Sequence, residues 1–324
     1  ISSLELQSVE EQIDQISSLV ENGGYYYCKG YDLTRSKQYS LHKKDHQEKF
    51  MWNYHLAASL TQHNISLDWT LPIIQGFIRY MEHKFSEQGK LKYILISRRS
   101  CKRAGTRFYS RGVDDLGQVS NFVESEQLLY LHNLVLSHVQ IRGSVPVFWQ
   151  QLGIDGLASN LKLNRTVELT ESAFISHFIK LKNTYKRFLC VNLLSVLKQS
   201  EAELTDFFEK CIQKTEPKIG QFVKYEYFDF HDKCRGEKFS GCNPLIQKLK
   251  AINESFRFYC YDEHAKEIVS KQEGTIRTNC LDCLDRTNFV QTKLAIQALD
   301  FMLHRLGIHF PVQLSEDMDQ MPSC

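Results

Sequence analysis

The chain has 324 residues, and its 40 Lys and Arg residues nearly balance 38 Asp and Glu residues, which gives a formal net charge of +2. This balance disfavours nucleic-acid-binding proteins, which usually carry a stronger basic excess, although local basic patches can still occur. The ten cysteines lack the spacing of a small secreted scaffold and no signal peptide precedes them, so we expect reduced thiols in a cytoplasmic protein. No apolar run is long enough to cross a bilayer.

Residues 1–45 are expected to form a piece separate from the rest of the chain. A predicted helix opens this piece and ends at Gly23 or Gly24, because glycine often caps helices. The aromatic run 25–27 and residues 31–34 then predict a strand and a turn. The apolar residues on one face of the predicted helix are Val9, Ile13, Ile16 and Val20.

Aromatic and aliphatic residues cluster between residues 50 and 78, with an extended run predicted over 71–74. We interpret Trp52 and Trp69 as core residues, since large aromatic side chains are usually well buried. A short apolar strand is predicted over 92–97. The basic cluster after it consists of Arg98, Arg99, Lys102, Arg103, Arg107 and Arg111. Such a cluster is either a solvated face or a contact surface for an anionic ligand at an anionic membrane.

Residues 119–148 read as strands separated by turns that contain glycine and proline. Arg142 could bring a second guanidinium to an anion site. Equally, it could belong to a structural turn and pair with Glu124 or Glu126. The polar residues 150–168 are predicted to form a loop.

From residue 174 onward, predicted helices and strands alternate along the chain. The apolar run 188–194 predicts a strand buried on both faces, and Ser200 with Glu203 forms a capping-box pattern at the start of a helix. Repeated strand and helix units indicate an α/β fold with a largely parallel mixed sheet flanked by helices, in which ligands bind beyond the carboxyl ends of the strands. The other elements expected here are helices over 174–185 and 244–252 and strands over 222–230 and 256–261.

Residues 277–288, with the sequence RTNCLDCLDRTN, form the loop around which the rest is arranged. Extended sequence precedes the loop, and an amphipathic helix is predicted after it, ending near Gly307. A loop that opens a helix points unpaired N–H groups and the positive end of the helix dipole at its mouth, which suits an anion. The apolar face of the helix consists of Val290, Leu294, Ile296, Leu299, Met302 and Leu303.

Cys280 and Arg286 form a C-x5-R pattern, which lets the curled loop place a thiol beneath an anion and a guanidinium beside it. A thiol next to an arginine and a helix N-terminus has a lowered pKa, so the nucleophilic thiolate is present at neutral pH. A guanidinium can hold two phosphate oxygens and stabilise charge during in-line displacement. We therefore expect attack by Cys280, a phosphocysteine intermediate and hydrolysis by water, with no metal or other cofactor.

Two other interpretations of the loop remain. Cys280 and Cys283 form C-x-x-C, which elsewhere marks a redox pair or half of a zinc site. The second half of a zinc site would come from His231 with Cys234 or from Cys260 with His264. A redox pair would leave Arg286 and the acidic residues unexplained, and a plain surface loop would not account for the crowding of Cys, Asp, Arg and Asn.

The stretch 277–291, RTNCLDCLDRTNFVQ, resembles the signature of the Sac-domain phosphoinositide phosphatases and is most similar to the synaptojanin-type version. Phe289 is the position that looks unlike the family. Further stretches read like the same domain in the same order, and the similarity covers roughly residue 45 to the end. These stretches are 97–100, 103–108, 111–112, 121–127, 140–146 and 148–149.

The resemblance implies a metal-independent phosphatase that removes a phosphate from the inositol ring, mainly the 4-phosphate, also the 3-phosphate, with the 3,5-bisphosphate as a further candidate. It implies phosphoinositide lipids at a membrane surface as partners and a cytoplasmic protein peripheral to membranes. Residues 1–45 would be the tail of an N-terminal subdomain, and 46–324 the catalytic domain, truncated at its C-terminal end. The alternatives are a non-catalytic phosphoinositide-binding module and a phosphoprotein phosphatase.

Within the loop, Asp282 is the better candidate for the general acid that protonates the leaving oxygen, and Asp285 is expected to brace the loop through backbone N–H groups. The residues predicted to contact substrate are Asn279, Leu281, Cys283, Leu284, Asp285, Thr287 and Asn288 from the loop, and Arg98, Arg103, Arg142, Asp229 and His231 from other parts of the chain.

Overall fold

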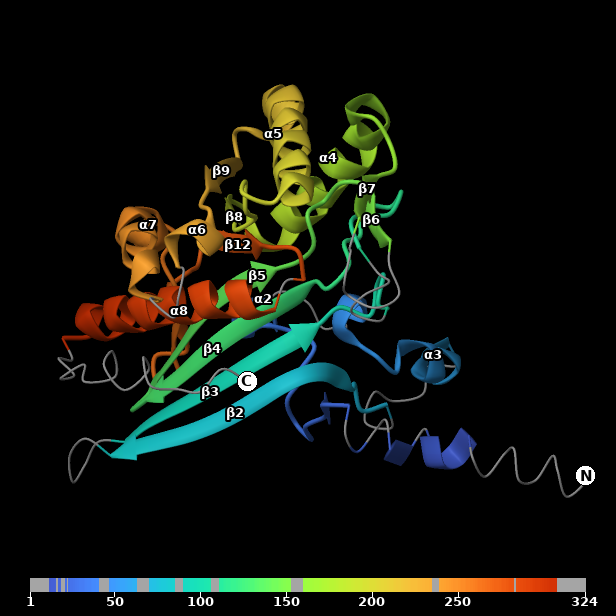
Figure 1. Cartoon of the computed structure of the whole chain (residues 1–324). Coiled ribbons are helices and arrows are strands. Elements are labelled where there is room, and N and C mark those ends of the chain that lie inside the picture. The colour runs from blue at the N-terminus through green and yellow to red at the C-terminus, as the bar shows by residue number, and fades with distance from the viewer. Residues whose placement is uncertain are drawn as a thin grey trace, which may run out of the picture.

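The structure, a computed structural model, describes residues 12–15, 17–18, 21, 23–40, 47–62, 70–84, 90–105, 111–152, 160–234, 239–282 and 284–307. Within these residues, ten strands form one sheet with the path β1-β2-β3-β4-β5-β12-β8-β9, and β10 and β11 lie off this path (Figure 1). Its strands are β1 (Tyr25–Tyr26), β2 (Ile74–Lys84), β3 (Lys90–Arg99), β4 (Val123–Leu131), β5 (Leu134–Arg142), β8 (Phe188–Asn192), β9 (Val223–Tyr227), β10 (Tyr259–Asp262), β11 (Glu267–Ser270) and β12 (Thr275–Asn279). The α-helices are α2 (Lys37–Ser40), α3 (Tyr54–Gln62), α4 (Val167–Tyr185), α5 (Gln199–Ile219), α6 (Phe230–Lys233), α7 (Asn243–Ser255) and α8 (Asp285–Arg305).

The predicted α/β class, with a mixed sheet flanked by helices, is confirmed. Parallel pairing is confined to β5, β12, β8 and β9, whereas β1 to β5 pair antiparallel, as do β10 with β5 and β11. The connections explain the difference: His132 and Asn133 alone join β4 to β5, which is enough for an antiparallel hairpin, while the helix α5 crosses over between β8 and β9. We therefore distinguish an antiparallel half, formed by β2, β3, β4 and β5, from a parallel half, formed by β5, β12, β8 and β9.

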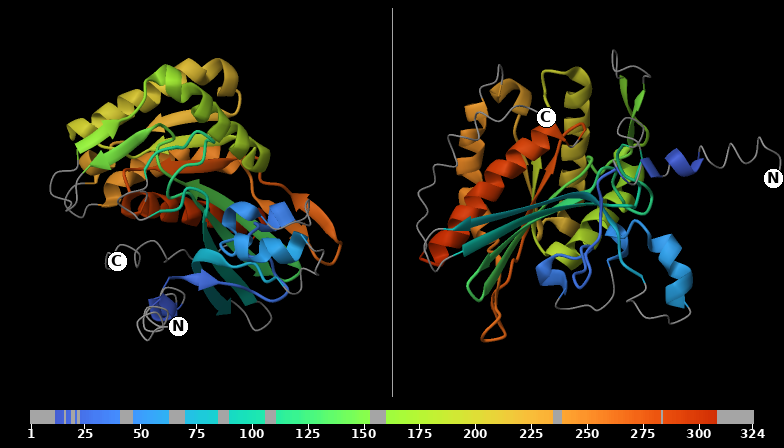
Figure 2. Two further views of the ribbon diagram at one scale, coloured as in Figure 1. Left: turned by 90° about the vertical axis from the view of Figure 1, so that its right-hand side faces the viewer. Right: turned by 90° about the horizontal axis from the view of Figure 1, so that it is seen from below.

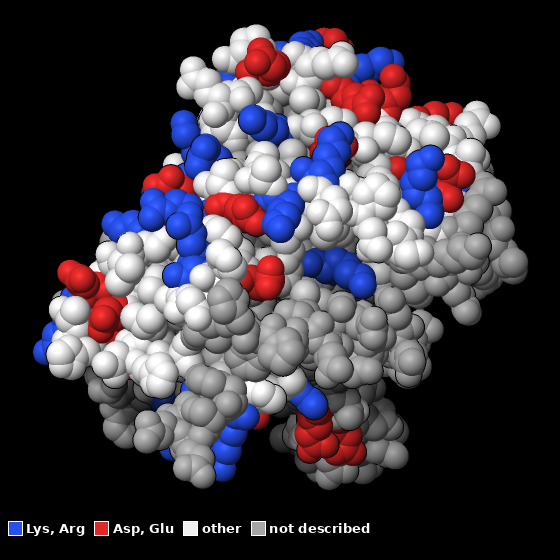
Figure 3. Space-filling view, turned by 90° about the vertical axis from the view of Figure 1, so that its left-hand side faces the viewer, with Lys and Arg blue, Asp and Glu red and all other residues white. Residues whose placement is uncertain are grey.

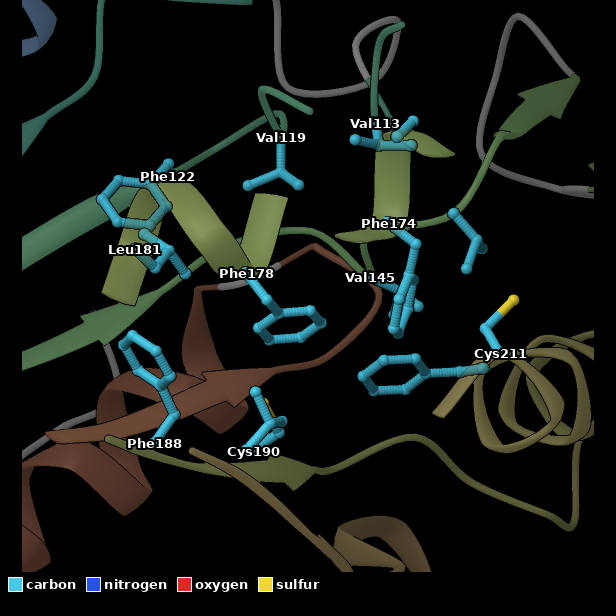
Figure 4. Packing of buried hydrophobic residues seen from close by; sticks show 14 of the residues in the cluster. Val113, Val119, Phe122, Val145, Phe174, Phe178, Leu181, Phe188, Cys190 and Cys211 are labelled. Atoms are coloured by element: carbon cyan, nitrogen blue, oxygen red, sulfur yellow. The ribbon is translucent and has the colours of Figure 1, made fainter. Parts of the chain in front are cut away.

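Strand β8 is buried on both faces, as its apolar sequence predicts. Phe188 and Cys190 pack with α4 and α5 in one cluster, where Phe174 and Phe178 meet edge to face (Figure 4). Leu189 belongs to a second cluster, which includes residues of α7 and α8. Helices thus cover both faces of the parallel half (Figure 2).

Strand β5 takes part in both halves of the sheet. Its first residues pair antiparallel with β10, and its last residues, Ile141 and Arg142, pair in parallel with β12. On its other edge β5 pairs with β4 along its whole length. The end of β5 is therefore carried to the same edge of the sheet as the end of β12.

The predicted loop over 150–168 is wrong. Strands β6 (Trp149–Leu152) and β7 (Asn160–Leu163) form a separate antiparallel pair, and α4 begins at Val167 with Thr166 as its N-cap. Leu161 and Leu163, on one face of β7, pack against the core. This short alternation among polar residues was too weak a signal to separate a strand from a loop.

The predicted capping box at Ser200 is also wrong, because α5 already begins at Gln199 and both Ser200 and Glu203 lie inside the helix. The N-cap residue is Lys198, whose side chain makes no capping hydrogen bond. The strand predicted over 222–230 ends early. Asp229 accepts a bond from the backbone N–H of Asp232 (2.9 Å) and caps α6, which stops β9 at Tyr227.

Other predicted elements are confirmed: residues 92–97 lie in β3, 174–185 in α4 and 244–252 in α7, while 256–261 overlaps β10. Helix α8 ends just before Gly307, whose φ of 71° suits a C-terminal cap. No helix in the described part of the chain is both long and apolar enough to cross a membrane.

The N-terminal piece is joined to the sheet through β1, which pairs with β2 within the run predicted as a strand. Residues 12–15 are helical and Ile13 is exposed, whereas Val9, Ile16 and Val20 lie outside the described residues, as does Trp69. Trp52 is half-buried, and its indole N–H donates to the carbonyl oxygen of Arg99 (2.9 Å). The boundary at residue 45 stays a prediction.

Candidate active site

The sequence RTNCLDCLDRTN lies at a strand-to-helix turn. β12 ends at Asn279 and α8 begins at Asp285, so residues 280–284 connect the two elements. β12 pairs in parallel with β5 on one side and β8 on the other, and the carboxyl ends of these strands meet at the turn (Figure 1). This is the edge of an α/β sheet at which ligands bind.

A buried polar network holds the base of the loop. The side chain of Asn279 donates to Asn192 (2.8 Å), which donates in turn to Thr205 (3.2 Å) and Tyr225 (3.0 Å). The backbone N–H of Leu193 donates to the carbonyl oxygen of Asn279 (2.9 Å). Asn279 was predicted to contact substrate, but its side chain is fully buried in this network, so we assign it to bracing the loop.

Cys280 is the first residue of the loop after β12 and is 2% exposed, packed among apolar side chains of β8, α7 and α8. Burial makes a thiol inert: it raises the pKa of Cys190, a core cysteine of β8, to about 11, even though the charge of Arg277 opposes this shift. Cys280 lies at the end of the sheet instead of inside it, and it interacts electrostatically with the guanidinium of Arg286. The two residues of the C-x5-R pattern are thus brought together.

Arg286 lies in the first turn of α8, and its guanidinium is bound by Leu193, which follows β8, and by Glu201 in the first turn of α5. Nη1 donates to Oε2 of Glu201 (2.8 Å) and to the carbonyl oxygen of Leu193 (3.2 Å), and Nη2 donates to Oε1 of Glu201 (3.3 Å). Burial opposes its charge, but the bond to Glu201 and the charges of Cys280 and Asp282 outweigh burial and raise the pKa of the guanidinium. Arg286 is therefore a fixed cation beside the thiol.

Asp282 forms an ion pair with Arg111, a member of the predicted basic cluster that was not among the predicted site residues. Arg111 also donates to Gln151 of β6 through Nε (3.2 Å) and Nη2 (2.9 Å). The Arg111 side chain is 1% exposed and that of Asp282 33%, so the carboxylate lies at the surface of the loop. Arg103, a predicted substrate contact, instead donates to Ser120 (3.1 Å) and to the carbonyl oxygen of Arg111 (2.7 Å).

The remaining loop residues divide into buried and exposed ones. Thr287 is fully buried and donates to the carbonyl oxygen of Leu284 (3.0 Å), and Leu281 packs against the core. Asp285 and Asn288 are exposed in the first turn of α8. The carboxylate of Asp285 is stabilised there by the positive end of the helix dipole.

Arg98, predicted to contact substrate, is a structural residue. Its side chain is fully buried and donates to Glu124 (3.0 Å) and Glu126 (2.6 Å). It also donates to the carbonyl oxygens of Leu33 and Arg35. Because these acceptors surround the guanidinium away from solvent, Arg98 cannot serve an incoming anion.

Arg142 ends β5 and donates through Nη1 to Gln291 of α8 (3.1 Å) and to Ser125 (3.4 Å). Glu124 and Glu126, the carboxylates with which Arg142 was alternatively predicted to pair, are both bound by Arg98. The structure thus places Arg142 between β5 and α8 at the carboxyl edge of the sheet, and contact with substrate stays a prediction.

Asp229 lies at this edge too, and it fixes the segment between β8 and α5. Its Oδ2 accepts from Ser195 Oγ (3.2 Å) and from the backbone N–H of Val196 (2.9 Å). Burial favours the protonated carboxyl, but these bonds and that from the Asp232 backbone prevail and lower its pKa. His231 is exposed on α6.

Cys283, the second cysteine of the C-x-x-C pattern, lies outside the described residues. Among the residues that are described, no three His, Cys, Asp or Glu side chains gather closely enough to hold a metal ion. Cys234, proposed as part of a second half-site, lies with its sulfur 3.2 Å from the sulfur of Cys242.

Sequence reasoning missed Glu201 and Asn192, which bind the two ends of the loop. Asn192 is the one polar residue in an apolar strand, and such a residue at the carboxyl end of a strand could have been flagged. Glu201 carried a weaker signal, since an acidic residue in the first turn of a helix usually serves the helix dipole.

Acidic and basic side chains are interspersed on the molecular face in Figure 3, in keeping with the small net charge. Several exposed lysines of the described residues are paired with carboxylates, among them Lys210 with Asp206 and Lys248 with Glu226. Exposed pairs of this kind contribute little to stability.

Comparison with known proteins places the chain in a family. A model of the SacI homology domain matches residues 3–235. Human synaptojanin-2 is 37% identical over 316 residues, which are 92% of this chain and 20% of that protein. The polyphosphatidylinositol phosphatase INP53 of Saccharomyces cerevisiae is 36% identical over 88% of the chain and 27% of that protein.

A relative from Danio rerio, the phosphatidylinositol-3-phosphatase SAC1-A, is 33% identical over 98% of this chain and 55% of that protein. The chain thus spans about a fifth to a half of the length of these relatives. The family match runs from the N-terminal piece through β2 to β9, and the relatives extend the similarity over most of the chain. The chain belongs to the SacI homology domain family.

Proposed function

We propose that this chain is a phosphoinositide phosphatase that uses Cys280 as its nucleophile. The observation that carries the proposal is the pairing of Cys280 with Arg286 at one strand-to-helix turn, where the thiol is buried and the guanidinium is charged and partly accessible. Helix α8 adds backbone N–H groups directed at the same place. Together these groups form a receptor for a phosphate with a nucleophile beneath it.

In the proposed reaction, the Cys280 sulfur attacks phosphorus and the bond from phosphorus to the inositol oxygen breaks. Arg286 stabilises the charge on the equatorial oxygens as this happens. A water molecule then attacks phosphorus, the sulfur–phosphorus bond breaks, and inorganic phosphate leaves with the thiolate restored. No step of this sequence calls for a metal.

Asp282 is the proposed general acid for the leaving oxygen. It follows Cys280 by two positions and lies at the surface of the loop, where its carboxyl group can exchange a proton with solvent. A carboxylate held by Arg111 has to loosen that ion pair to carry a proton. The proposal therefore gives Arg111 an influence on the acid through this ion pair.

The substrate class comes from the relatives, two of which are named as phosphatases of phosphatidylinositol phosphates. We propose the lipid 4-phosphate as the main substrate, the 3-phosphate as a second and the 3,5-bisphosphate as a third. We further propose that the protein acts on these lipids peripherally, at the cytoplasmic surface of a membrane.

The test is phosphate release by the purified chain from a panel of short-chain phosphoinositides, with phosphopeptides measured beside them. Cys280→Ser is expected to abolish release while circular dichroism and the unfolding temperature stay unchanged. Cys28→Ser, which alters an exposed cysteine, is the matched control and should remain fully active.

Full activity of Cys280→Ser would refute the cysteine mechanism. Faster turnover of phosphopeptides than of any lipid would favour a phosphoprotein phosphatase. Binding of the lipids without phosphate release would leave a non-catalytic phosphoinositide-binding module, the remaining alternative.

A further inference from the structure

One edge of the Arg286 guanidinium is already occupied. An arginine side chain offers an end edge, formed by Nη1 and Nη2, and a side edge, formed by Nε and Nη2. Glu201 takes the end edge through both carboxylate oxygens, and Leu193 takes the other hydrogen of Nη1. Within the described residues, the side edge donates to no protein acceptor, so it can bind two oxygens of a phosphate.

Glu201 is itself held rigidly. Its side chain is 2% exposed in the first turn of α5, and its Oε2 also accepts from the backbone N–H of Ser195 (2.8 Å). The ammonium of Lys198 lies 3.8 Å from Oε1 and adds a longer ion pair. A carboxylate fixed by these donors cannot follow Arg286 if the arginine moves, so it defines where the guanidinium sits.

The segment that carries Ser195 is fixed in turn by Asp229. Both the hydroxyl of Ser195 and the backbone of Val196 donate to its carboxylate. These contacts fix the position of Glu201 relative to the ends of β8 and β9. The loop fixes the position of Arg286 relative to the end of β12. The guanidinium is positioned by rigid elements on both sides, as preorganised electrostatic stabilisation requires.

We propose that Glu201 is a positioning residue, which binds the end edge of Arg286 so that its side edge faces the oxygens of a phosphate monoester above Cys280. The proposal rests on the proposed function for its substrate class. A carboxylate repels phosphate, so Glu201 acts through Arg286 and touches no substrate. The opposite role, a clamp that competes with phosphate for Arg286, would make its removal increase activity.

The experiment compares Glu201→Gln with Glu203→Gln, the same change at an exposed position of the same helix. Loss of one carboxylate oxygen and of the charge should let the guanidinium shift, and displacement of this kind costs about 10- to 100-fold in rate. We expect kcat on the short-chain lipid to fall by that factor while KM changes little. Glu203→Gln should keep both constants.

A second readout needs no turnover. Orthovanadate, which occupies the place of a transferring phosphoryl group, should raise the unfolding temperature of the unmodified protein and inhibit it, and Glu201→Gln should weaken both effects by about the factor lost in kcat. If the unmodified chain released no phosphate from any lipid, the proposed function would fail, while vanadate binding would still decide the role of Glu201.

Glu201→Asp keeps the buried charge but shortens the side chain. If Glu201→Gln does not fold, this variant tests whether Glu201 acts by positioning Arg286. Positioning predicts a loss for Glu201→Asp as well, whereas an effect of charge alone predicts activity near that of the unmodified protein. Unchanged kcat and vanadate inhibition in folded Glu201→Gln, a gain in either, or an equal loss in Glu203→Gln would each overturn the proposal.

Discussion

Each half of the sheet is associated with an arginine that is bound to a carboxylate, and the two arginines differ in how much of the guanidinium stays accessible. In the antiparallel half, Arg98 is fully buried and bound by both Glu124 and Glu126. In the parallel half, the one carboxylate that pairs with Arg286 among the described residues is that of Glu201, and the Arg286 side chain is 21% exposed. A saturated arginine holds the fold together, and an arginine with an open edge at the end of the strands can serve an anion.

The difference comes from topology as much as from residue type. Arg98 lies on β3, and both glutamates lie on the neighbouring antiparallel strand β4. The ladder places Glu124 opposite Arg98, with Glu126 two positions further along β4. Arg286 follows a parallel strand at the edge of the sheet, where the chain turns into a helix and backbone N–H groups point outward. Charge buried within a ladder is structural, whereas charge at the strand ends is available for chemistry.

The largest expected effect comes from Arg286→Lys, which keeps the positive charge but removes the two-edged geometry. Lysine cannot bind Glu201 and a phosphate bidentately at once, so kcat/KM should fall by about 10²- to 10³-fold while the protein stays folded. Arg187→Lys, at a half-exposed arginine, is the control. Retained activity in Arg286→Lys would break the contrast between the two arginines.

Arg98→Met should act on stability and not on chemistry. It leaves Glu124 and Glu126 buried without their cation, and breaking a buried ion pair in this way costs about 3–5 kcal/mol. Urea unfolding measures the loss, and the activity per folded molecule should remain unchanged. The neighbouring, partly buried Arg99→Met should cost less, and equal losses would contradict the structural role of Arg98.

The antiparallel half should also weaken in mild acid through His138 of β5. Burial lowers the pKa of His138 to about 4, although Asn253 favours the charged form. The ordinary pKa of histidine is 6.5, so between that pH and about pH 4 His138 takes up a proton in the unfolded chain but not in the folded protein. The free energy of unfolding therefore decreases as the pH falls through this range. The contribution is up to about 3 kcal/mol.

The measurement is the free energy of unfolding between pH 7 and pH 4. His138→Gln should flatten part of this slope, and His55→Gln, at an exposed histidine, should leave it unchanged. A slope that is identical in the unmodified protein and in His138→Gln would assign the acid sensitivity to other groups.

The smallest expected effect is that of a chelator. If the thiol and the arginine of the parallel half perform the reaction by themselves, excess EDTA leaves the rate of phosphate release unchanged. The control is the same EDTA with added magnesium. Strong inhibition that magnesium or zinc reverses would show that a metal takes part.

The features encoded by neighbouring residues could be predicted from the sequence. The strand-to-helix turn within 277–288, the helix that ends just before Gly307 and the doubly buried strand at the start of 188–194 each depend on a local pattern. Each is found in the structure, although the strand ends at Asn192. The pair of strands β6 and β7 was missed because only Leu161 and Leu163 signal its apolar face.

The partners of the loop could not be predicted, because they are distant along the chain. Glu201 is 85 positions from Arg286, and Arg111 is 171 positions from Asp282. Nothing in the sequence distinguishes Arg98 from Arg111, since both belong to one basic cluster. Only the pairing of strands decides that one of them meets two glutamates and the other meets the loop.

The central place of β12 has a consequence for the order in which the fold can be completed. Among the described strands of the sheet, β12 is the last in the sequence, yet it lies between β5 and β8, whose other edges pair with β4 and β9. Cys280 and Arg286 follow β12 directly in the sequence, so the proposed site is complete only when β12 is in its place. If the chain is a phosphatase as proposed, phosphate release should therefore report that the parallel half has folded completely.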